Sequence, residues 1–358
     1  MRHRFTIICV MAVVVAFSAT SGFAAKKYEG QTMQVMIGIT ALAAEQVRDY
    51  IAPKLKEKYG IETAVETVGS AAMLEKIMVQ KDNPRITIAG WDTPIGAKAV
   101  EMGLTTTIDL NKLPTVKDNM YDWCLVKQGN EVKVLTTSII SPGLIYNEDE
   151  FKRRGFPPPT SWNDLWKKEY SGRVSIVAPE STMGLGSLVM IARMEGGGES
   201  NIDPGFKKLK TLLPNIHTIH TWSTEGIKLM QLGEVWMIIQ SQNIATAMRE
   251  TGFPARWVAP KEGAPLVNGG ISIIAKAPYQ DVAYDFLNLY YSQEYQQKRM
   301  KESGAVPPLK SIWAKMSEKD REGLPLTERD FNKLVDLDWV KINNEKQAWI
   351  ERWKKEMK

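Results

Sequence analysis

Strand-like and helical segments alternate at the start of the chain, and this alternation restricts the possible folds more than any other feature of the sequence. Residues 34–39, 61–68 and 86–89 are short runs rich in Val, Ile, Thr and Met. Helical segments at 41–58 and 71–80 separate them. Because parallel strands need a long connection between them, usually a helix, this order predicts a mainly parallel sheet covered by helices.

A second α/β block follows the first, and the composition changes again near residue 270. This order predicts two lobes of ordinary domain size and two crossings between them, near residues 135–142 and 258–270. The predicted parts are lobe 1, at residues 25–138 together with 270–358, and lobe 2, at residues 139–269.

The last quarter of the chain is predicted to be mostly helical. Residues 282–303 carry a long amphipathic pattern, and the tail from Pro307 onward is charged. Tryptophans at helical intervals in such a tail favour core packing over a ligand site. These tryptophans are Trp313, Trp339, Trp349 and Trp353.

The N-terminus has the pattern of a secretory signal. Arg2 and Arg4 precede an uncharged apolar run, Phe5–Phe17, and small residues follow it. The run is shorter than the roughly 20 apolar residues that a membrane-spanning helix needs, so an anchor is the weaker alternative. We therefore expect residues 1–24 to be cleaved and the mature protein to be free in the periplasm.

Charge and cysteine content exclude several classes of protein. Loss of the signal removes two arginines and lowers the formal charge from +5 to +3. No dense Lys/Arg patch interleaved with aromatics is present, so no nucleic-acid partner is expected. The mature chain keeps one cysteine, Cys124, and can form no internal disulfide. Its neighbours Trp123 and Leu125 predict a core position.

Sequence signs of catalysis are scarce. The chain has no Gly-x-Ser-x-Gly elbow and no phosphate-binding loop ending in Gly-Lys-Ser/Thr. His217 and His220 are close enough to share a zinc ion, but no cysteine or obvious carboxylate partner lies nearby in the sequence. We expect no catalytic residue, no metal and no cofactor. A secreted hydrolase or lyase remains the alternative from another class.

Six short segments, in order along most of the chain, carry a family pattern. They are Trp91–Thr93, Gly143–Asn147, Thr160–Trp166 continuing to Tyr170–Val174, Gly233–Trp236, Pro260–Gly263, and Ala283–Leu289 with Ser292–Glu294. Each segment alone is a weak signal, but the six together are a strong one. The chain resembles the extracellular solute-binding proteins that serve polyamine, ferric-iron and related small-solute ABC importers.

This resemblance implies a type II periplasmic-binding-protein fold, with two α/β lobes joined by a hinge. It also implies that a small solute binds in the cleft and that closure presents the complex to an ABC permease and its ATPase in the inner membrane. A monomer is the expected state, because one receptor docking on one permease needs no self-association. A sensory subunit that contacts a membrane kinase is a further alternative.

Ligands in open α/β sheets lie beyond the carboxyl ends of strands, where helix N-termini point backbone N–H groups at them. Trp91 could stack on a ligand or equally pack in the core, and the residues near Ser181 could be ordinary N-caps. The predicted ligand-binding residues are Thr40, Ala41, Trp91, Asp92, Thr93, Ser181, Thr182, Gly184, Gln240, Gln242, Asn243 and Asn268.

Departures from the family pattern guide the choice of solute. Polyamine members hold ammonium groups with carboxylates and aromatics, but the aligned positions here are Ser181, Gly184 and Gly269, with only Glu180 nearby. Ferric members use adjacent tyrosines where this chain has neutral residues at 240–243. We therefore predict a small anionic or zwitterionic solute, such as a carboxylate, phosphonate or sulfonate. A polyamine receptor with an altered acidic site is the alternative.

Overall fold

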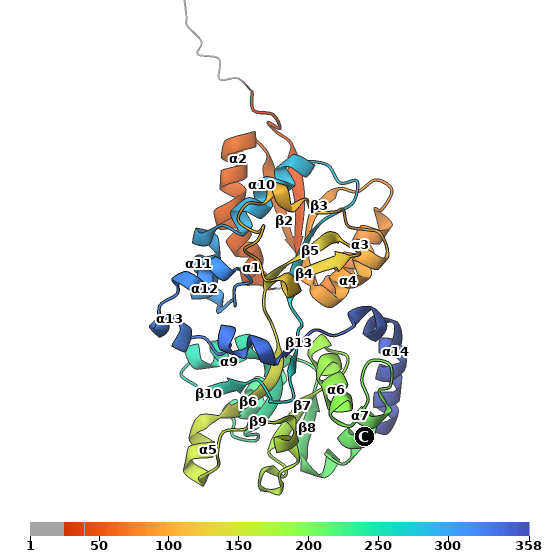
Figure 1. The fold of residues 1–358 in the computed structure, drawn as a ribbon, viewed down its shortest axis with the longest axis vertical. Coiled ribbons are helices and arrows are strands. Elements are labelled where there is room, and N and C mark those ends of the chain that lie inside the picture. The colour runs from red at the N-terminus through yellow and green to blue at the C-terminus, as the bar shows by residue number, and fades with distance from the viewer. Residues whose placement is uncertain (1–24, 39, 358) are drawn as a thin grey trace, which may run out of the picture.

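The structure, a computed structural model, describes residues 25–38 and 40–357, which form two α/β lobes stacked along the long axis of the molecule (Figure 1). The predicted signal at residues 1–24 lies outside the described residues. In the described part, no helix is both long enough and apolar enough to cross a membrane.

Lobe 1 is built on a six-stranded sheet. Its strands, in spatial order, are β2 (Glu62–Thr67), β1 (Thr32–Ile37), β3 (Ile86–Asp92), β12 (Gly269–Ile273), β5 (Glu131–Ser138) and β4 (Leu125–Gln128). The first three strands are parallel, as the alternation predicted. The strand β12 returns from the other lobe and runs antiparallel to both β3 and β5, so it joins the three parallel strands to the β5–β4 pair.

Helices cover both faces of this sheet. They are α1 (Ala41–Gln46), α2 (Ala52–Tyr59), α3 (Ser70–Val79), α4 (Thr93–Glu101), α10 (Gln280–Tyr290) and α11 (Gln293–Ser303). The short helices α12 (Lys310–Lys315) and α13 (Glu318–Glu322) follow α11 toward the junction of the lobes (Figure 1). A π-helical turn, Val47–Ile51, joins α1 to α2, so the predicted 41–58 helix is continuous. The predicted long helix at 282–303 is wrong, because Ser292 adopts an extended conformation and its hydroxyl caps α11 by accepting the N–H of Tyr295.

Lobe 2 has a five-stranded sheet with both parallel and antiparallel strand pairs. In spatial order its strands are β10 (Ala255–Val258), β6 (Pro142–Asn147), β9 (Met237–Ser241), β7 (Val174–Val177) and β8 (Ile216–His220). Its helices are α5 (Glu148–Arg154), α6 (Thr182–Met194), α7 (Asp203–Lys210), α8 (Ser223–Gln231) and α9 (Gln242–Glu250). The central strand β7 is parallel to β8 and β9, so helices α6 and α8 start at the same edge of the sheet.

Short helical turns and one small sheet complete the structure. The 3₁₀ turns are Leu110–Lys112, Asp122–Cys124, Trp162–Trp166, Lys168–Tyr170, Leu213–Asn215 and Glu328–Lys333. The small sheet pairs β11 (Ala264–Pro265) with β13 (Leu334–Val335) in parallel. Since β11 lies in the second crossing between the lobes, this pairing fixes a late segment of the chain at the junction.

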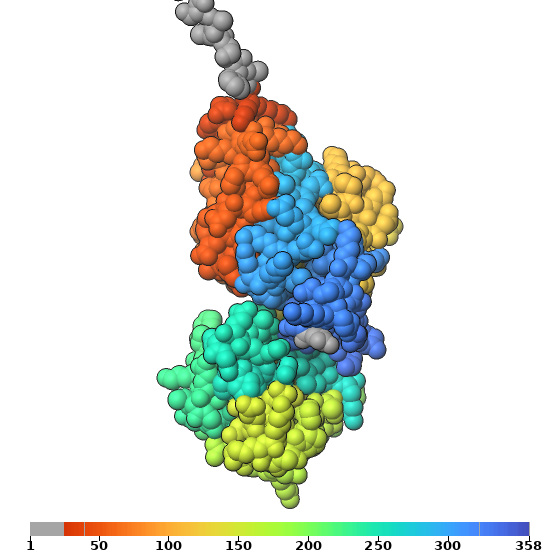
Figure 2. All heavy atoms as spheres, turned by 90° about the vertical axis from the view of Figure 1, so that its left-hand side faces the viewer, coloured from red at the N-terminus to blue at the C-terminus, as the bar shows by residue number. Residues whose placement is uncertain are grey.

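A third crossing returns the chain to lobe 2, contrary to the predicted boundary of lobe 1 at residue 358. After residue 304 the chain passes the junction and ends in the helix α14 (Trp339–Glu356), which lies beside α6 and α7 (Figure 1). Figure 2 shows the C-terminal part of the chain reaching across the junction of the lobes. The apolar side chains of α14 join the core of lobe 2, while Asn343 of the same helix donates a hydrogen bond to the carbonyl of Pro94 in α4 of lobe 1 at 2.8 Å.

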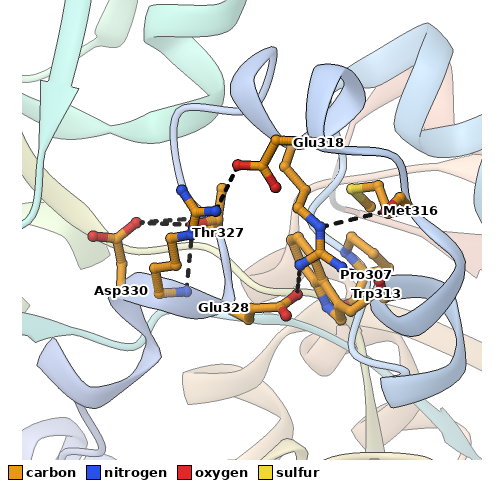
Figure 3. A network of polar contacts seen from close by, with 9 residues as sticks. Pro307, Trp313, Met316, Glu318, Thr327, Glu328 and Asp330 are labelled. Atoms are coloured by element: carbon orange, nitrogen blue, oxygen red, sulfur yellow. Dashed lines mark hydrogen bonds and ion pairs between the residues drawn. The ribbon is translucent and has the colours of Figure 1, made fainter.

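Polar contacts hold the third crossing in a compact form (Figure 3). The indole N–H of Trp313 donates to the carbonyl of Pro307 at 3.0 Å. Arg321 forms an ion pair with Glu328 at 2.6 Å. These contacts connect successive short helices that have little apolar surface of their own.

The tail tryptophans are core residues, as predicted. Trp339, Trp349 and Trp353 are buried in the lobe 2 core, where Trp353 packs edge-to-face on Phe206 with 6.3 Å between ring centroids. Cys124 is fully buried in the lobe 1 core, and burial raises the pKa of its thiol well above the usual range. The thiol is therefore protonated and unreactive at neutral pH.

Candidate ligand-binding cleft

A cavity of about 720 Å³ opens between the two lobes. Its lining comes from both lobes and from the two crossings between them, so a molecule bound there would contact both lobes. The lining residues are Gly38, Thr40, Ser70, Asp92, Ile140, Glu180, Ser181, Thr182, Met183, Thr221, Trp222, Ser223, Gln240, Ser241, Asn243, Ile244, Val267 and Gly269.

Six helices start at this cavity, three from each lobe. This follows from the sheet topology, because successive strands of each lobe end at the edge that faces the other lobe. Each helix N-terminus carries unsatisfied N–H groups and about half a unit of positive charge. The lining residues at these N-termini are Thr40 for α1, Ser70 for α3, Asp92 for α4, Ser181 for α6, Trp222 for α8 and Ser241 for α9.

The N-termini differ in how far the protein itself satisfies them. Thr40 and Ser181 cap their own helices through side-chain oxygens, with N···O distances of 3.0 and 3.2 Å. Among the described residues, no side chain caps α3 or α9, whose N-cap residues are Gly69 and Ser241. The first N–H groups of these two helices, one from each lobe, are thus free to bind an anion.

The charged side chains of the lining are both acidic. Asp92, at the end of β3, accepts a hydrogen bond from the hydroxyl of Thr182 across the cleft at 3.3 Å. Glu180 lies 3.5 Å from the ammonium group of Lys354 through one oxygen, while its other oxygen is buried and has no hydrogen-bond partner in the described part of the chain. Lining residues in the described ranges include no Lys, Arg or His.

Trp222 is the aromatic side chain of the cavity, and the sequence analysis missed it. It precedes α8, and 69% of its surface is exposed, which is unusual for the largest apolar side chain. The carboxylate of Glu225 accepts the backbone N–H groups of Thr221 and Trp222, at 2.9 and 3.2 Å, and so fixes this turn. The spacing of Trp222 and Glu225 marks the start of α8 but does not indicate that the ring is exposed.

Six of the twelve predicted ligand-binding residues line the cavity, and six lie beside it. Trp91 is fully buried, and its indole packs against Gly96 of α4, so the alternative of a packing aromatic fits its position. Gly184 packs against the carbonyl of Ala178, which leaves no room for a side chain. The residues in the lining are Thr40, Asp92, Ser181, Thr182, Gln240 and Asn243; those outside it are Ala41, Trp91, Thr93, Gly184, Gln242 and Asn268.

Two of the residues outside the lining, Gln242 and Asn268, form hydrogen bonds to the backbone of the first crossing. The buried Gln242 accepts the N–H of Ser141 at 2.9 Å and donates to the carbonyl of Ile139 at 2.7 Å. The side chain of Asn268 accepts the N–H of Ile140 at 3.1 Å. Three consecutive residues of the first crossing are therefore held by amide side chains.

His220 is the last residue of β8 in the lobe 2 sheet. It is buried, its Nδ1 is 2.8 Å from the hydroxyl of Ser175, and its Nε2 faces Gly226. Burial lowers the pKa of His220 to about 4, so the ring is neutral at physiological pH. Within the described ranges, no group of three or more His, Cys, Asp or Glu side chains is placed to hold a metal ion.

Comparisons with known proteins agree with this architecture. A family model described as bacterial extracellular solute-binding protein matches residues 50–322. The chain belongs to this family. A crystal structure of an ABC transporter protein from Clostridium perfringens superposes with a TM-score of 0.77, covers 91% of this chain and all of its own, and is 21% identical. The type II periplasmic-binding fold with two lobes is thereby confirmed.

Two further relatives are named for ligands. The spermidine/putrescine-binding periplasmic protein 1 of Haemophilus influenzae is 23% identical over 70% of each chain. The periplasmic binding protein AfuA of Actinobacillus pleuropneumoniae, solved with fructose-6-phosphate bound, has a TM-score of 0.69 and 24% identity, and covers 92% of this chain and 99% of its own. By its family the chain is thus a bacterial extracellular solute-binding protein, and the relatives that it resembles include a periplasmic polyamine-binding protein and a periplasmic binding protein solved with a sugar phosphate.

Proposed function

We propose that this family member is the periplasmic receptor of an ABC importer for a small polar solute with at least one anionic group. The observation that carries this proposal is the convergence of six helix N-termini on one cavity. Each N-terminus stabilises an anion by about 0.3–1 kcal/mol where it is exposed, and by more where it is partly buried. With no basic side chain among the described lining residues, the anion would be bound by backbone N–H groups and hydroxyls.

Closure of the lobes around the solute would be the functional step. Lobe 1 offers Thr40 and Ser70, and lobe 2 offers Ser181 and Ser241, so one small ligand can bind residues of both lobes. A ligand that contacts both lobes favours the closed state by the free energy of the contacts that form only there. The exposed Trp222 would lose solvent-accessible surface in that step.

The cellular setting follows from the same proposal. The family match and the periplasmic relatives support export through a cleaved signal at residues 1–24. We further propose that the receptor is a monomer without catalytic activity and that it delivers its solute to a membrane permease driven by an ATPase. Measured turnover of a bound solute would contradict this and favour an enzyme on the same fold.

A polyamine is the second candidate solute, and a specific observation favours it. Asp92, Glu180 and Trp222 all line the cavity, and carboxylates with an aromatic are the groups that bind alkylammonium ions. The spermidine/putrescine-binding relative supports the same candidate. The neutral amide and hydroxyl residues at 240–243 and the free helix N-termini weigh against it.

A thermal-shift screen tests the proposal. The mature protein is unfolded and refolded to remove carried-over ligand, then heated with carboxylates, phosphonates, sulfonates, sugar phosphates and polyamines. A ligand at a hundredfold excess over its dissociation constant stabilises the folded state by about 2.7 kcal/mol. A shift with solutes that carry an anionic group supports the proposal. A shift with polyamines alone would overturn the assignment of an anionic solute but would keep the proposal that the protein is a receptor.

A further inference from the structure

Three hydrogen-bond acceptors of the cleft lack a strong partner. One oxygen of Glu180 and the side-chain oxygen of Asn243 are buried and without a hydrogen-bond partner in the part of the chain that the structure describes. Asp92 precedes α4 but does not cap it, and its contact with Thr182 is long, at 3.3 Å. A buried acceptor without a donor costs about 1–3 kcal/mol, and a charged one costs more. The free protein thus keeps acceptors for a donor that it does not itself supply.

The two carboxylates come from opposite lobes and line the same cavity. Thr182, which donates to Asp92 of lobe 1, follows Glu180 of lobe 2 by two residues. Two like charges that face one cavity repel each other unless a cation lies between them. Lys354 is the nearest cation to Glu180, but it is on α14, is mostly exposed and is not among the lining residues.

We propose that the solute carries a primary ammonium group that binds between Asp92 and Glu180, so that the solute is a small zwitterion. This inference rests on the proposed function, which supplies the anionic group at the free N-termini of α3 and α9. An ammonium group has three N–H donors and no acceptor, which fits two carboxylates and the oxygen of Asn243. The class is an aminoalkyl carboxylate, sulfonate or phosphonate.

A zwitterion accounts for both sets of groups, while a simple anion or a diamine accounts for one. An anion without an amine would leave Asp92 and Glu180 unpaired and would be repelled by both. A diamine would place a cation against the helix N-termini, whose partial charge is positive. The acidic pair and the uncapped helices are separate observations, and a molecule with both charges satisfies them together.

Matched ligand pairs test the ammonium group directly. Isothermal titration calorimetry on the refolded mature protein compares β-alanine with propionate, taurine with ethanesulfonate, and 3-aminopropylphosphonate with propylphosphonate; putrescine is the diamine. We expect at least one amine-bearing member to bind about tenfold or more tighter than its partner. Equal binding within every responding pair would overturn the inference but keep the proposed function. Binding of putrescine without any zwitterion would overturn both.

Charge-removing variants locate the ammonium group. Asp92→Asn and Glu180→Gln keep the side-chain volume. Each is expected to weaken binding of the zwitterion by about tenfold, while binding of the amine-free partner is unchanged or tighter. Asp82→Asn, an exposed carboxylate in a turn of lobe 1, is the matched control and should change neither. Lys354→Met tests whether Glu180 acts through its ion pair. A loss with Lys354→Met equal to that with Glu180→Gln, or no loss with either charge-removing variant, would overturn the assignment.

Discussion

Gln242 offers a sharp test of how the hinge is stabilised. Its side chain makes two hydrogen bonds to the first crossing, to the N–H of Ser141 and the carbonyl of Ile139, at a site that is 1% exposed. Gln242→Leu keeps a similar volume but leaves both backbone groups buried and unpaired. Each unpaired group costs about 1–3 kcal/mol, so for the two groups we expect a loss of roughly 2–6 kcal/mol in the free energy of unfolding. Urea denaturation followed by circular dichroism measures it.

The matched control is Gln231→Leu, at the exposed end of α8, which should change the free energy of unfolding by less than about 0.5 kcal/mol. The same variants measured with a bound ligand separate stability from closure, since a loosened crossing should also weaken binding. A loss below about 0.5 kcal/mol for Gln242→Leu would refute the reasoning. It would mean that water or a shifted backbone replaces both hydrogen bonds at little cost.

Three further variants test the cleft and the core. Trp222→Ala should weaken ligand binding by about tenfold in calorimetry while changing the free energy of unfolding by under about 0.5 kcal/mol, because the ring is exposed. The pKa of His220 is about 4 in the folded state, below its ordinary value of 6.5. The neutral ring therefore contributes its full share to the free energy of unfolding above pH 6.5, and this share is lost as the pH falls toward 4. Urea titrations should show about 2 kcal/mol lost between pH 7.5 and 5, and less in His220→Asn. Trp353→Ala should cost roughly 3–5 kcal/mol in the same assay, and a loss under about 1 kcal/mol would contradict the packing of α14 in the lobe 2 core.

Local patterns were enough to predict part of the secondary structure and the edge where the cavity lies. Short apolar runs and helix starts are set by neighbouring residues, so β1, β3 and the caps Thr40 and Ser181 were predictable. Alternation along a strand also implies that successive side chains face opposite ways. In β3, Asp92 faces the cleft and Trp91 faces α4. The sequence alone could not decide which of these two side chains faces the cleft and which faces the core.

Contacts between distant segments were beyond the reach of the sequence. The tryptophans of α14 indicate an apolar face, but the same face could cover either lobe, and the pairing of β13 with β11 decides it. Glu180 was noticed only as a remaining acid, since Asp92, the other carboxylate of the cavity lining, lies 88 positions earlier in the chain. Trp222 was missed because exposure of an apolar ring cannot be read from spacing.

At two strand ends, one residue lines the cavity and the residue before it holds the first crossing. Asn243 lines the cavity while Gln242 binds the first crossing, and Gly269 lines it while Asn268 binds the same crossing. A ligand that binds at the start of α9 or β12 therefore contacts residues that are adjacent in sequence to Gln242 and Asn268, whose side chains hold the first crossing. A switch from 1% to 99% closed needs about 5.5 kcal/mol of differential binding. This short path lets contacts at the cleft reach the hinge without a chain of intermediate side chains, and it explains why two of the predicted ligand residues, Gln242 and Asn268, lie beside the cavity.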